Sequence, residues 1–328
     1  MIHITILVPE DAVLASIDDP RMMFAGVNEF LEAQGREPVF KIQLAGLSRE
    51  VKLHKGRFTV HADALLREIP KTDLIFVPAL TGDLKEGLEK NKDLIPWIVE
   101  QYHKGAQVAS LCIGAFLLAA TGLLNGKRCS THWRYADLFR EMFPEVMLVD
   151  DRIITEEQRV YSSGGANSYW NLLLYLVEKY TDREMAILAS KIYAVEIDRK
   201  SQSPFIMFNG QKGHEDEDIK KVQEFIEKNV AEKVSVENLA TKFAIGRRSF
   251  EKRFKKATNN TPVEYIQRVK IEAAKRSLET SRKNVTEVMY DVGYYDTKAF
   301  RTVFKKITGL SPIDYRNKYN KGQAVLAL

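Results

Sequence analysis

Cys112 stands where a buried strand is expected to turn into a helix, in the run SLCIGAF of residues 110–116. Gly114 follows shortly after, and this spacing is typical of a nucleophile elbow, in which a strained turn exposes a side chain and the next helix N-terminus lowers a thiol pKa. His132 lies further along the chain and can reach the same pocket. A small cysteine buried at the end of an apolar strand is the simpler explanation of one Cys and one Gly.

A repeated pattern near the C-terminus predicts contacts with DNA. The segment FKKATNNTPVEY (residues 254–265) recurs 50 residues later as FKKITGLSPIDY (residues 304–315), and Phe250 lies over Phe300. Each copy predicts a helix, a short turn and a second helix, which is the helix-turn-helix arrangement that lays its second helix in the major groove. A further helix that begins after Thr261 is expected to link the two copies.

The exposed faces of the two second helices supply the candidate DNA contacts. Their phenylalanines recur at i and i+4 and should face the core, which leaves the polar side chains nearer the DNA. The expected contacts are Arg247, Arg248, Ser249, Lys252 and Arg253 in the first copy and Thr297, Lys298, Arg301 and Thr302 in the second. The lysines one turn further on are expected to contact phosphates: Lys255, Lys256, Lys305 and Lys306. Glu251 repels phosphate, so it either accepts from a cytosine amino group or pairs with Lys255.

Net charge divides the chain into two parts. The whole sequence of 328 residues carries +5. Residues 219–328 hold 24 Lys and Arg against 12 Asp and Glu, a charge of +12, so residues 1–218 carry −7. A slightly acidic body with a strongly basic tail is expected of a protein that docks one end on a polyanion, and the length predicts two domains.

Short β-rich runs alternate with helical patterns over the first part of the chain, which predicts a parallel sheet covered by helices on both faces. Residues 198–218 mix Pro, Gly, Ser and acidic residues without periodicity, and the pattern after them is wholly helical. We therefore expect an α/β domain over residues 1–206, a linker over residues 207–218 and an all-α domain over residues 219–328. The expected strands are residues 3–8, 39–46, 73–79, 107–112, 145–150, 152–157 and 159–164.

Cysteine usage and the apolar segments bear on the compartment. Two cysteines, Cys112 and Cys129, cannot build a disulfide framework, and the first residues lack the features of a signal peptide, so we expect a cytoplasmic protein. The uncharged residues 105–126 are long enough to span a bilayer, but Gly114 and Gly122 interrupt them. They are better explained as a buried strand followed by a buried helix, and we expect no membrane association, metal or cofactor.

Residues 234–319, above all DVGYYDTKAFRTVFKKITGLSPIDYR, resemble the DNA-binding domain of the AraC/XylS transcription regulators. The resemblance covers both helix-turn-helix units. It implies two recognition helices that enter successive major-groove segments on one face of the DNA, joined by a rigid linking helix. Many members place an Arg two residues after the first Phe of the second recognition helix, whereas here Arg301 comes one residue after Phe300 and Thr302 takes that place. The family's base code therefore does not transfer to this chain.

Residues 3–206 resemble the PfpI/ThiJ branch of the class I glutamine amidotransferase-like superfamily, on the runs SLCIGAFLLAATGLLNGKRCSTHW and YSSGGANSYWNLLLYLVE. The resemblance implies a flavodoxin-like fold, with Cys112 at the elbow and His132 as the family's downstream His. Hydrolytic members often have His directly after the Cys, where this chain has Ile113. Related regulators often have an acid near the end of the first strand, where this chain has Ser16, with Asp18 and Asp19 displaced toward Pro20.

Three functions remain open at this stage. The first is a regulator that binds double-stranded DNA, with a small-molecule effector held near Cys112, Ile113, His132 and Ser16. The second is a Cys-dependent hydrolase or hydratase with a DNA-binding tail, and the third is a redox sensor that acts through Cys112. We favour the first and a catalytically inactive PfpI-like domain, because a thiol without a positioned acid and base is a poor catalyst. A homodimer and contact with RNA polymerase are further expectations from the resemblance.

Overall fold

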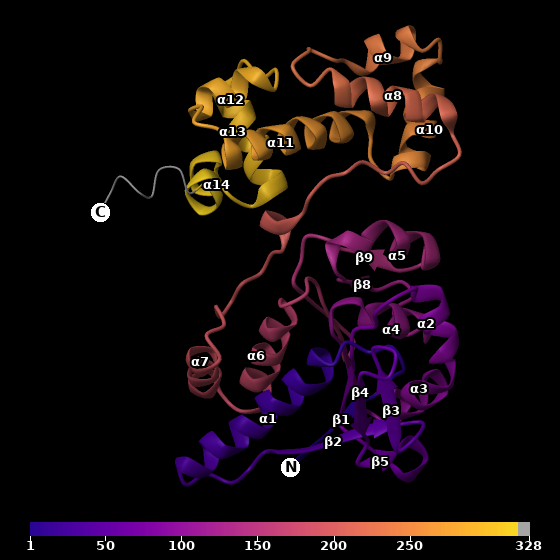
Figure 1. Ribbon diagram of the computed structural model, residues 1–328, viewed down its shortest axis with the longest axis vertical. Helices are drawn as coiled ribbons and strands as arrows, with labels where there is room; N and C mark the ends of the chain where they lie inside the picture. The colour runs from indigo at the N-terminus through magenta and orange to yellow at the C-terminus, as the bar shows by residue number, and fades with distance from the viewer. Residues whose placement is uncertain (321–328) are drawn as a thin grey trace. The chain divides into compact units, whose positions relative to one another are not determined.

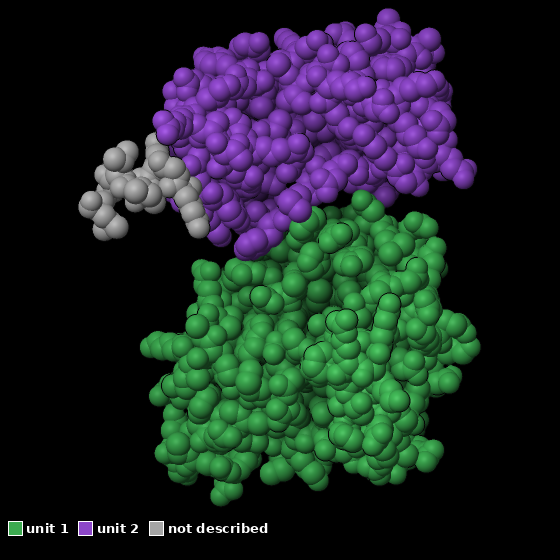
Figure 2. All heavy atoms as spheres, in the orientation of Figure 1, with its two compact units in different colours: residues 1–202 green, residues 203–328 purple. Residues whose placement is uncertain are grey.

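The computed structural model describes residues 1–320, and the chain divides after Gln202 into two compact units (Figure 2). The division lies four residues before the end of the α/β domain expected over residues 1–206. The linker expected over residues 207–218 is packed onto the second unit: Phe208 is buried in that unit's core, and a helix begins at Glu217. The last eight residues of the expected all-α domain, 321–328, lie outside the described residues.

A mostly parallel sheet forms the centre of the first unit (Figure 1). Among the described residues it has seven strands in the order β10-β11-β7-β6-β1-β2-β5, and all neighbours are parallel except β10 and β11. The fold class expected from the sequence is confirmed. The strands of this sheet are β1 (Ile2–Leu7), β2 (Phe40–Gly46), β5 (Ala64–Leu65), β6 (Leu74–Val77), β7 (Gln107–Ser110), β10 (Ile154–Glu157) and β11 (Val160–Ser163).

Helices cover both faces of this sheet. In Figure 1, α1, α6 and α7 lie on one side of the strands, and α2, α3 and α4 lie on the other. Both faces are therefore buried, which explains why all four side chains of β6 are apolar and buried. The helices are α1 (Ala15–Ala33), α2 (Leu84–Lys90), α3 (Ile95–His103), α4 (Ala115–Ala120), α5 (Ala136–Met142), α6 (Tyr169–Tyr180) and α7 (Arg183–Ile192), with 3-10 turns η1 (Leu66–Glu68), η2 (Lys92–Leu94), η3 (Cys112–Gly114) and η4 (Trp133–Tyr135).

Two small two-stranded sheets were not expected in this form. β3 (Glu50–Leu53) and β4 (Phe58–His61) make an antiparallel hairpin, and β8 (Arg128–Cys129) pairs with β9 (Met147–Leu148). The strand expected over residues 145–150 is thus reduced to two residues, because only that short stretch finds a partner strand. Residues 105–126 divide into β7, η3 and α4, and no helix among residues 1–320 has the length and apolarity that a bilayer crossing requires.

The second unit is helical and contains the repeat. It comprises η5 (Ser203–Phe205), α8 (Glu217–Lys228), α9 (Val236–Lys242), α10 (Arg247–Thr258), α11 (Pro262–Thr280), α12 (Val285–Asp291), α13 (Thr297–Thr308) and α14 (Pro312–Tyr319). The pairs α9–α10 and α12–α13 are the two predicted helix-turn-helix units, and α11 joins them. Each helix-turn-helix pair has a hydrophobic core of its own. The first half of α11 contributes to the core around α9 and α10, and the second half contributes to the core around α12 and α13.

Candidate functional site

The backbone at Cys112 has the strained geometry of an elbow. Cys112 follows β7 and opens η3 with φ of +54°, a left-handed conformation that residues other than glycine rarely adopt. Gly114 has no room for a side chain, since a Cβ there would lie 2.4 Å from the carbonyl oxygen of Val77 and 2.5 Å from that of Pro78. The glycine lets the turn press against the end of β6, as the spacing of Cys and Gly predicts.

The Cys112 thiol is nevertheless buried. The residue is 6% exposed, its N–H donates to Ser163 Oγ at 3.2 Å, and its carbonyl accepts from Thr131 Oγ1 at 3.2 Å. Burial raises the pKa of the thiol from its ordinary value to about 12. This burial agrees with the simpler explanation of Cys112 as a small cysteine at the end of an apolar strand, and desolvation of the thiolate is the largest influence on its pKa.

We predict slow alkylation of Cys112. A pKa of about 12 leaves roughly a thousandth of the thiolate that a thiol of pKa 9.0 would have at pH 8, and the thiolate is the nucleophile. The rate with iodoacetamide should therefore fall about a thousandfold below that of a free thiol and rise with pH up to about 12. Intact-mass measurements on the native chain, with the urea-unfolded chain as the reactive control, check this. A native rate equal to the unfolded one would contradict the buried thiol.

A phenol near the elbow is hydrogen-bonded to a carboxylate. Tyr169 at the start of α6 donates its hydroxyl to Asp19 Oδ2 at 2.5 Å, although the two residues are 150 positions apart. Burial raises the pKa of Asp19 from its ordinary value, and hydrogen bonds from Tyr169 and Trp170 oppose this rise. The pKa of Tyr169 is raised by burial, by Asp19 and, more weakly, by the nearby Cys112. The displaced acid noted in the sequence is thus bonded to a tyrosine that lies near the elbow residue.

The His132 side chain is hydrogen-bonded to the local backbone. It forms the N-cap of η4, where its Nδ1 accepts a hydrogen bond from the Arg134 N–H at 3.1 Å. Burial, and then the charge of Arg134, lowers the pKa of the imidazole below its ordinary value. Among the described residues no hydrogen bond joins His132 to Cys112; the neighbouring Thr131 makes the contact instead.

Ser16 and Ile113, the other two candidates for the ligand site, have structural roles. Ser16 donates its hydroxyl to the carbonyl of Val13 at 2.6 Å and accepts from the N–H of Ala79 at 3.0 Å, so it braces the start of α1 against the end of β6. Ile113 is buried within η3. The sequence missed Tyr169 and Trp170, which follow SSGGANS after β11. Residues after the carboxyl end of a parallel strand are the signal that would have found them.

The recognition helices α10 and α13 present the polar faces predicted from the repeat. Phe250, Phe254, Phe300 and Phe304 are fully buried, as their spacing predicts. Both helices end in the same way: Thr258 and Thr308 donate to the carbonyls of Phe254 and Phe304, each at 2.9 Å. The exposed members of the predicted set are Arg247, Arg248, Ser249, Lys252, Lys255, Lys256, Thr297, Lys298, Arg301, Thr302, Lys305 and Lys306.

Two arginines of the predicted set are already paired. Arg253 forms ion pairs with Asp216 at 2.6 Å and Asp218 at 2.9 Å, which raises its pKa and fastens α10 to the start of α8. The equivalent residue in the repeat, 50 positions on, is the half-buried Val303. That apolar partner is the sequence signal that Arg253 faces protein. Exposed Arg247 pairs with Glu237 and Glu251, so the intrahelical partner of Glu251 is Arg247 in place of Lys255, which was one of the two alternatives.

A buried lysine joins the two helix-turn-helix units. Lys270 in the middle of α11 donates to the carbonyls of Val230, Glu232 and Val292 at 2.7, 3.0 and 2.8 Å. The first two carbonyls precede α9 and the third ends α12, so one ammonium group holds both units. Burial lowers its pKa. Gly293 packs so close that a Cβ would lie 2.3 Å from the carbonyl oxygen of Ala231. The segment before α9 and the end of α12 are therefore held together at this point.

A second buried group ties the expected linker to the same helix. Lys275 Nζ lies 2.7 Å from Glu272 Oε2 and donates to the carbonyl of Ile206 at 2.6 Å, while the Phe208 N–H donates to Glu272 at 3.1 Å. Further along, Lys212 pairs with Glu227 of α8 at 2.7 Å. We call residues 203–216 the strap, because it contacts α14, α11 and α8 in turn.

Comparisons with known proteins agree with this architecture. The family model described as a helix-turn-helix domain matches residues 239–318, and that of the DJ-1/PfpI family matches residues 28–179. The transcriptional regulator GbdR of Pseudomonas aeruginosa is 24% identical over 267 residues, which are 81% of this chain and 72% of that protein. ArgR of the same species is 26% identical over 221 residues, 67% of each chain.

Solved structures resemble the first unit. A proposed transcriptional regulator from Vibrio parahaemolyticus has a TM-score of 0.52 and 27% identity, and covers 58% of this chain and 98% of its own. A ThiJ/PfpI family protein from Pseudomonas syringae has a TM-score of 0.50 and 19% identity, covers 63% and 78% of the two chains, and shows the fold alone. The two domains define a helix-turn-helix transcriptional regulator. Within that class, the chain belongs with the AraC-type regulators that carry a DJ-1/PfpI domain.

Proposed function

We propose that this regulator responds to a small molecule bound beside the elbow in the first unit, and that the DJ-1/PfpI domain has no catalytic role. The observation that carries the proposal is the contrast between the two units. The second unit has both recognition helices with their polar faces exposed, whereas the Cys112 thiol is buried and protonated and His132 is bonded to the backbone. A protonated thiol without a partnered base suits a binding site better than a nucleophile.

The elbow offers a ligand a carboxylate within an aromatic setting. Asp19 is half-buried, with Tyr169 and Trp170 as its hydrogen-bond partners. A carboxylate held by two donors in a partly desolvated site favours a ligand that brings a cationic or hydrogen-bonding group. Amino acids and amines are the first compounds to screen.

Thermal shift is the experiment that tests ligand binding. An effector at a hundred times its Kd should stabilise the chain by about 2.7 kcal/mol. Asp19→Asn should abolish most of this shift, whereas Glu89→Gln, which removes an exposed carboxylate of α2 paired with Lys92, should leave it unchanged. Cys112-dependent turnover of a bound compound would replace the proposal with a hydrolase. Loss of DNA binding on peroxide treatment, prevented by Cys112→Ser, would replace it with a redox sensor.

The exposed lysines of the recognition helices should contact different parts of the DNA, some at base edges and some at phosphates. Lys252 and Lys298 lie in the first two turns of α10 and α13, and we place them at base edges; Lys305 lies a turn further on, and we place it at a phosphate. Lys252→Ala or Lys298→Ala should weaken operator binding by about 1–3 kcal/mol and relax preference at particular bases. Lys305→Ala should weaken binding to all sequences and lower the salt slope by about 1.

Fluorescence anisotropy with operator and scrambled duplexes, at several salt concentrations, separates the two kinds of contact. Lys41→Ala, at an exposed lysine of the first unit, is the matched control and should change nothing. Equal losses on both duplexes for all three recognition-helix variants would show that the helices are placed wrongly. A homodimer, contact with RNA polymerase and a cytoplasmic location complete the proposal.

A further inference from the structure

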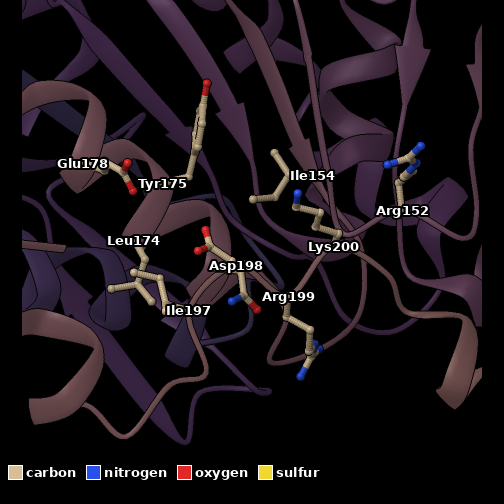
Figure 3. Close-up of a pocket in the computed structure, with 10 residues that line it drawn as sticks. Arg152, Ile154, Leu174, Tyr175, Glu178, Ile197, Asp198, Arg199 and Lys200 are labelled. Carbon is tan, nitrogen blue, oxygen red and sulfur yellow. The ribbon is translucent and has the colours of Figure 1, made fainter. Parts of the chain in front are cut away.

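A pocket separate from the elbow opens where the first unit ends (Figure 3). It has a volume of about 310 Å³, within the range of small-molecule sites. Its walls come from α6, from the start of β10 and from residues 197–200, the last stretch before the chain enters the second unit. The lining residues are Arg152, Ile154, Asn171, Leu174, Tyr175, Glu178, Ile197, Asp198, Arg199 and Lys200.

The pocket combines apolar and polar lining residues. Ile154, Leu174 and Ile197 supply the apolar surface, and Leu174 is almost fully buried. Asn171 is also buried, and its Nδ2 donates to the carbonyl of Glu196 at 2.6 Å. Its Oδ1 makes no hydrogen bond within residues 1–320, so it can accept one from a ligand.

The charges around the pocket leave an excess of positive groups. Arg183 neutralises both carboxylates, at 2.7 Å from Glu178 and 2.5 Å from Asp198. In the described part of the chain, Arg152 and Lys200 form no ion pair, although Lys200 is close enough to Asp198 to help lower its pKa. In Figure 3 the Lys200 side chain extends toward Ile154, so an ammonium group lies at the edge of the apolar surface.

We propose that this pocket is a second effector site that takes an amphipathic carboxylate, such as an aromatic or short aliphatic acid. The hydrocarbon part packs on Ile154, Leu174 and Ile197, and the carboxylate lies between Arg152 and Lys200. The site goes beyond the effector site proposed at the elbow, since the two share no residue.

The position of the pocket gives its ligand a way to act on the second unit. Two backbone hydrogen bonds hold residues 200–202, the end of the first unit, against residues 151–153. The Ile153 N–H donates to the Lys200 carbonyl at 3.2 Å, and the Gln202 N–H donates to the Asp151 carbonyl at 2.9 Å. Side-chain bonds from Ser201 to the Asp151 carbonyl at 2.9 Å and from Gln202 to the Arg152 carbonyl at 3.2 Å join the same two segments, and a ligand that bridges Arg152 and Lys200 adds a further link. The bound acid therefore stiffens the chain directly before the strap, and it acts on DNA affinity through that segment.

Calorimetric titration of the full chain with benzoate and hexanoate tests the proposal, with benzamide and hexanamide as uncharged controls. At least one acid should bind, and its amide should bind at least tenfold more weakly. Arg152→Gln and Lys200→Gln should each weaken the acid at least fivefold. Lys191→Gln, at an exposed lysine of α7, should leave its affinity unchanged.

The outcomes distinguish this pocket from the elbow. Asp19→Asn should not affect acid binding; if it abolishes binding while Lys200→Gln does not, the acid occupies the elbow and the proposal is wrong. Equal binding of acid and amide, or no binding of either acid at 5 mM, roughly the weak end of small-ligand affinity, also overturns it. Melting temperatures of the unliganded variants confirm that each surface substitution leaves the fold intact.

Discussion

Phe300→Ala is expected to unfold the second helix-turn-helix unit while the first stays folded. Phe300 is fully buried against Phe304 and Tyr294 in a core whose buried members all differ from those of the core around α9 and α10, although the half-buried Val230 packs against both. Loss of a buried phenylalanine costs about 3–5 kcal/mol, which is close to the whole stability of so small a core. The variant should therefore lose order in α12 and α13.

Hydrogen exchange followed by mass spectrometry measures this effect. Peptides from α12 and α13 should exchange at least a hundredfold faster in Phe300→Ala, and peptides from α9 and α10 should keep their protection. Phe250→Ala is the matched variant in the first copy and should give the reverse pattern. Equal loss of protection in both units for either variant would show one cooperative core in place of two.

Removal of the Glu272 carboxylate is expected to have the second large effect. The Lys275 side chain is only 4% exposed, so Glu272→Ala leaves an ammonium group buried without its counter-charge and frees the Phe208 N–H. Breaking a buried pair in this way costs about 3–5 kcal/mol. Urea unfolding should show this loss, and trypsin should cut the strap faster than in the unaltered chain.

The double variant Glu272→Leu with Lys275→Met separates charge from packing. Because no unpaired charge remains, it should recover most of the lost stability. The exposed pair of Lys283 and Asp291 is the surface control: Asp291→Ala should cost less than about 1 kcal/mol. If the single and double variants are equally unstable, the Glu272 carboxylate stabilises the strap through something other than its charge.

Local patterns account for the parts of the fold that the sequence predicted. Short apolar runs such as LIFV in β6 favour strands buried on both faces over helices because of their length, and strands of that kind require helices on each side. The repeat predicted the second unit, because the same phenylalanine spacing must fill two equivalent cores. The β3–β4 hairpin was missed although Val51 and Leu53 alternate with exposed residues and a turn with positive φ at Gly56 follows them.

The candidate site was less predictable, for reasons of distance and desolvation. No local pattern links Asp19 to Tyr169, because they meet only when α1 and α6 pack side by side. The pKa of Cys112 depends on how deeply the thiol is buried, and a motif does not contain that information. No sequence pattern marks Lys270 and Lys275 as buried, because the strap and loops that cover them pack onto α11 from elsewhere in the chain.

Footprinting of the full chain on a duplex selected from random sequence is the most direct test of DNA recognition by two helices. The unaltered chain should protect two major-groove segments about one helical turn, roughly 10 base pairs, apart. A variant with Arg248→Ala and Lys252→Ala should lose one segment, and a variant with Lys298→Ala and Arg301→Ala should lose the other. Selection of no preferred sequence, or one segment that both variants weaken equally, would contradict it.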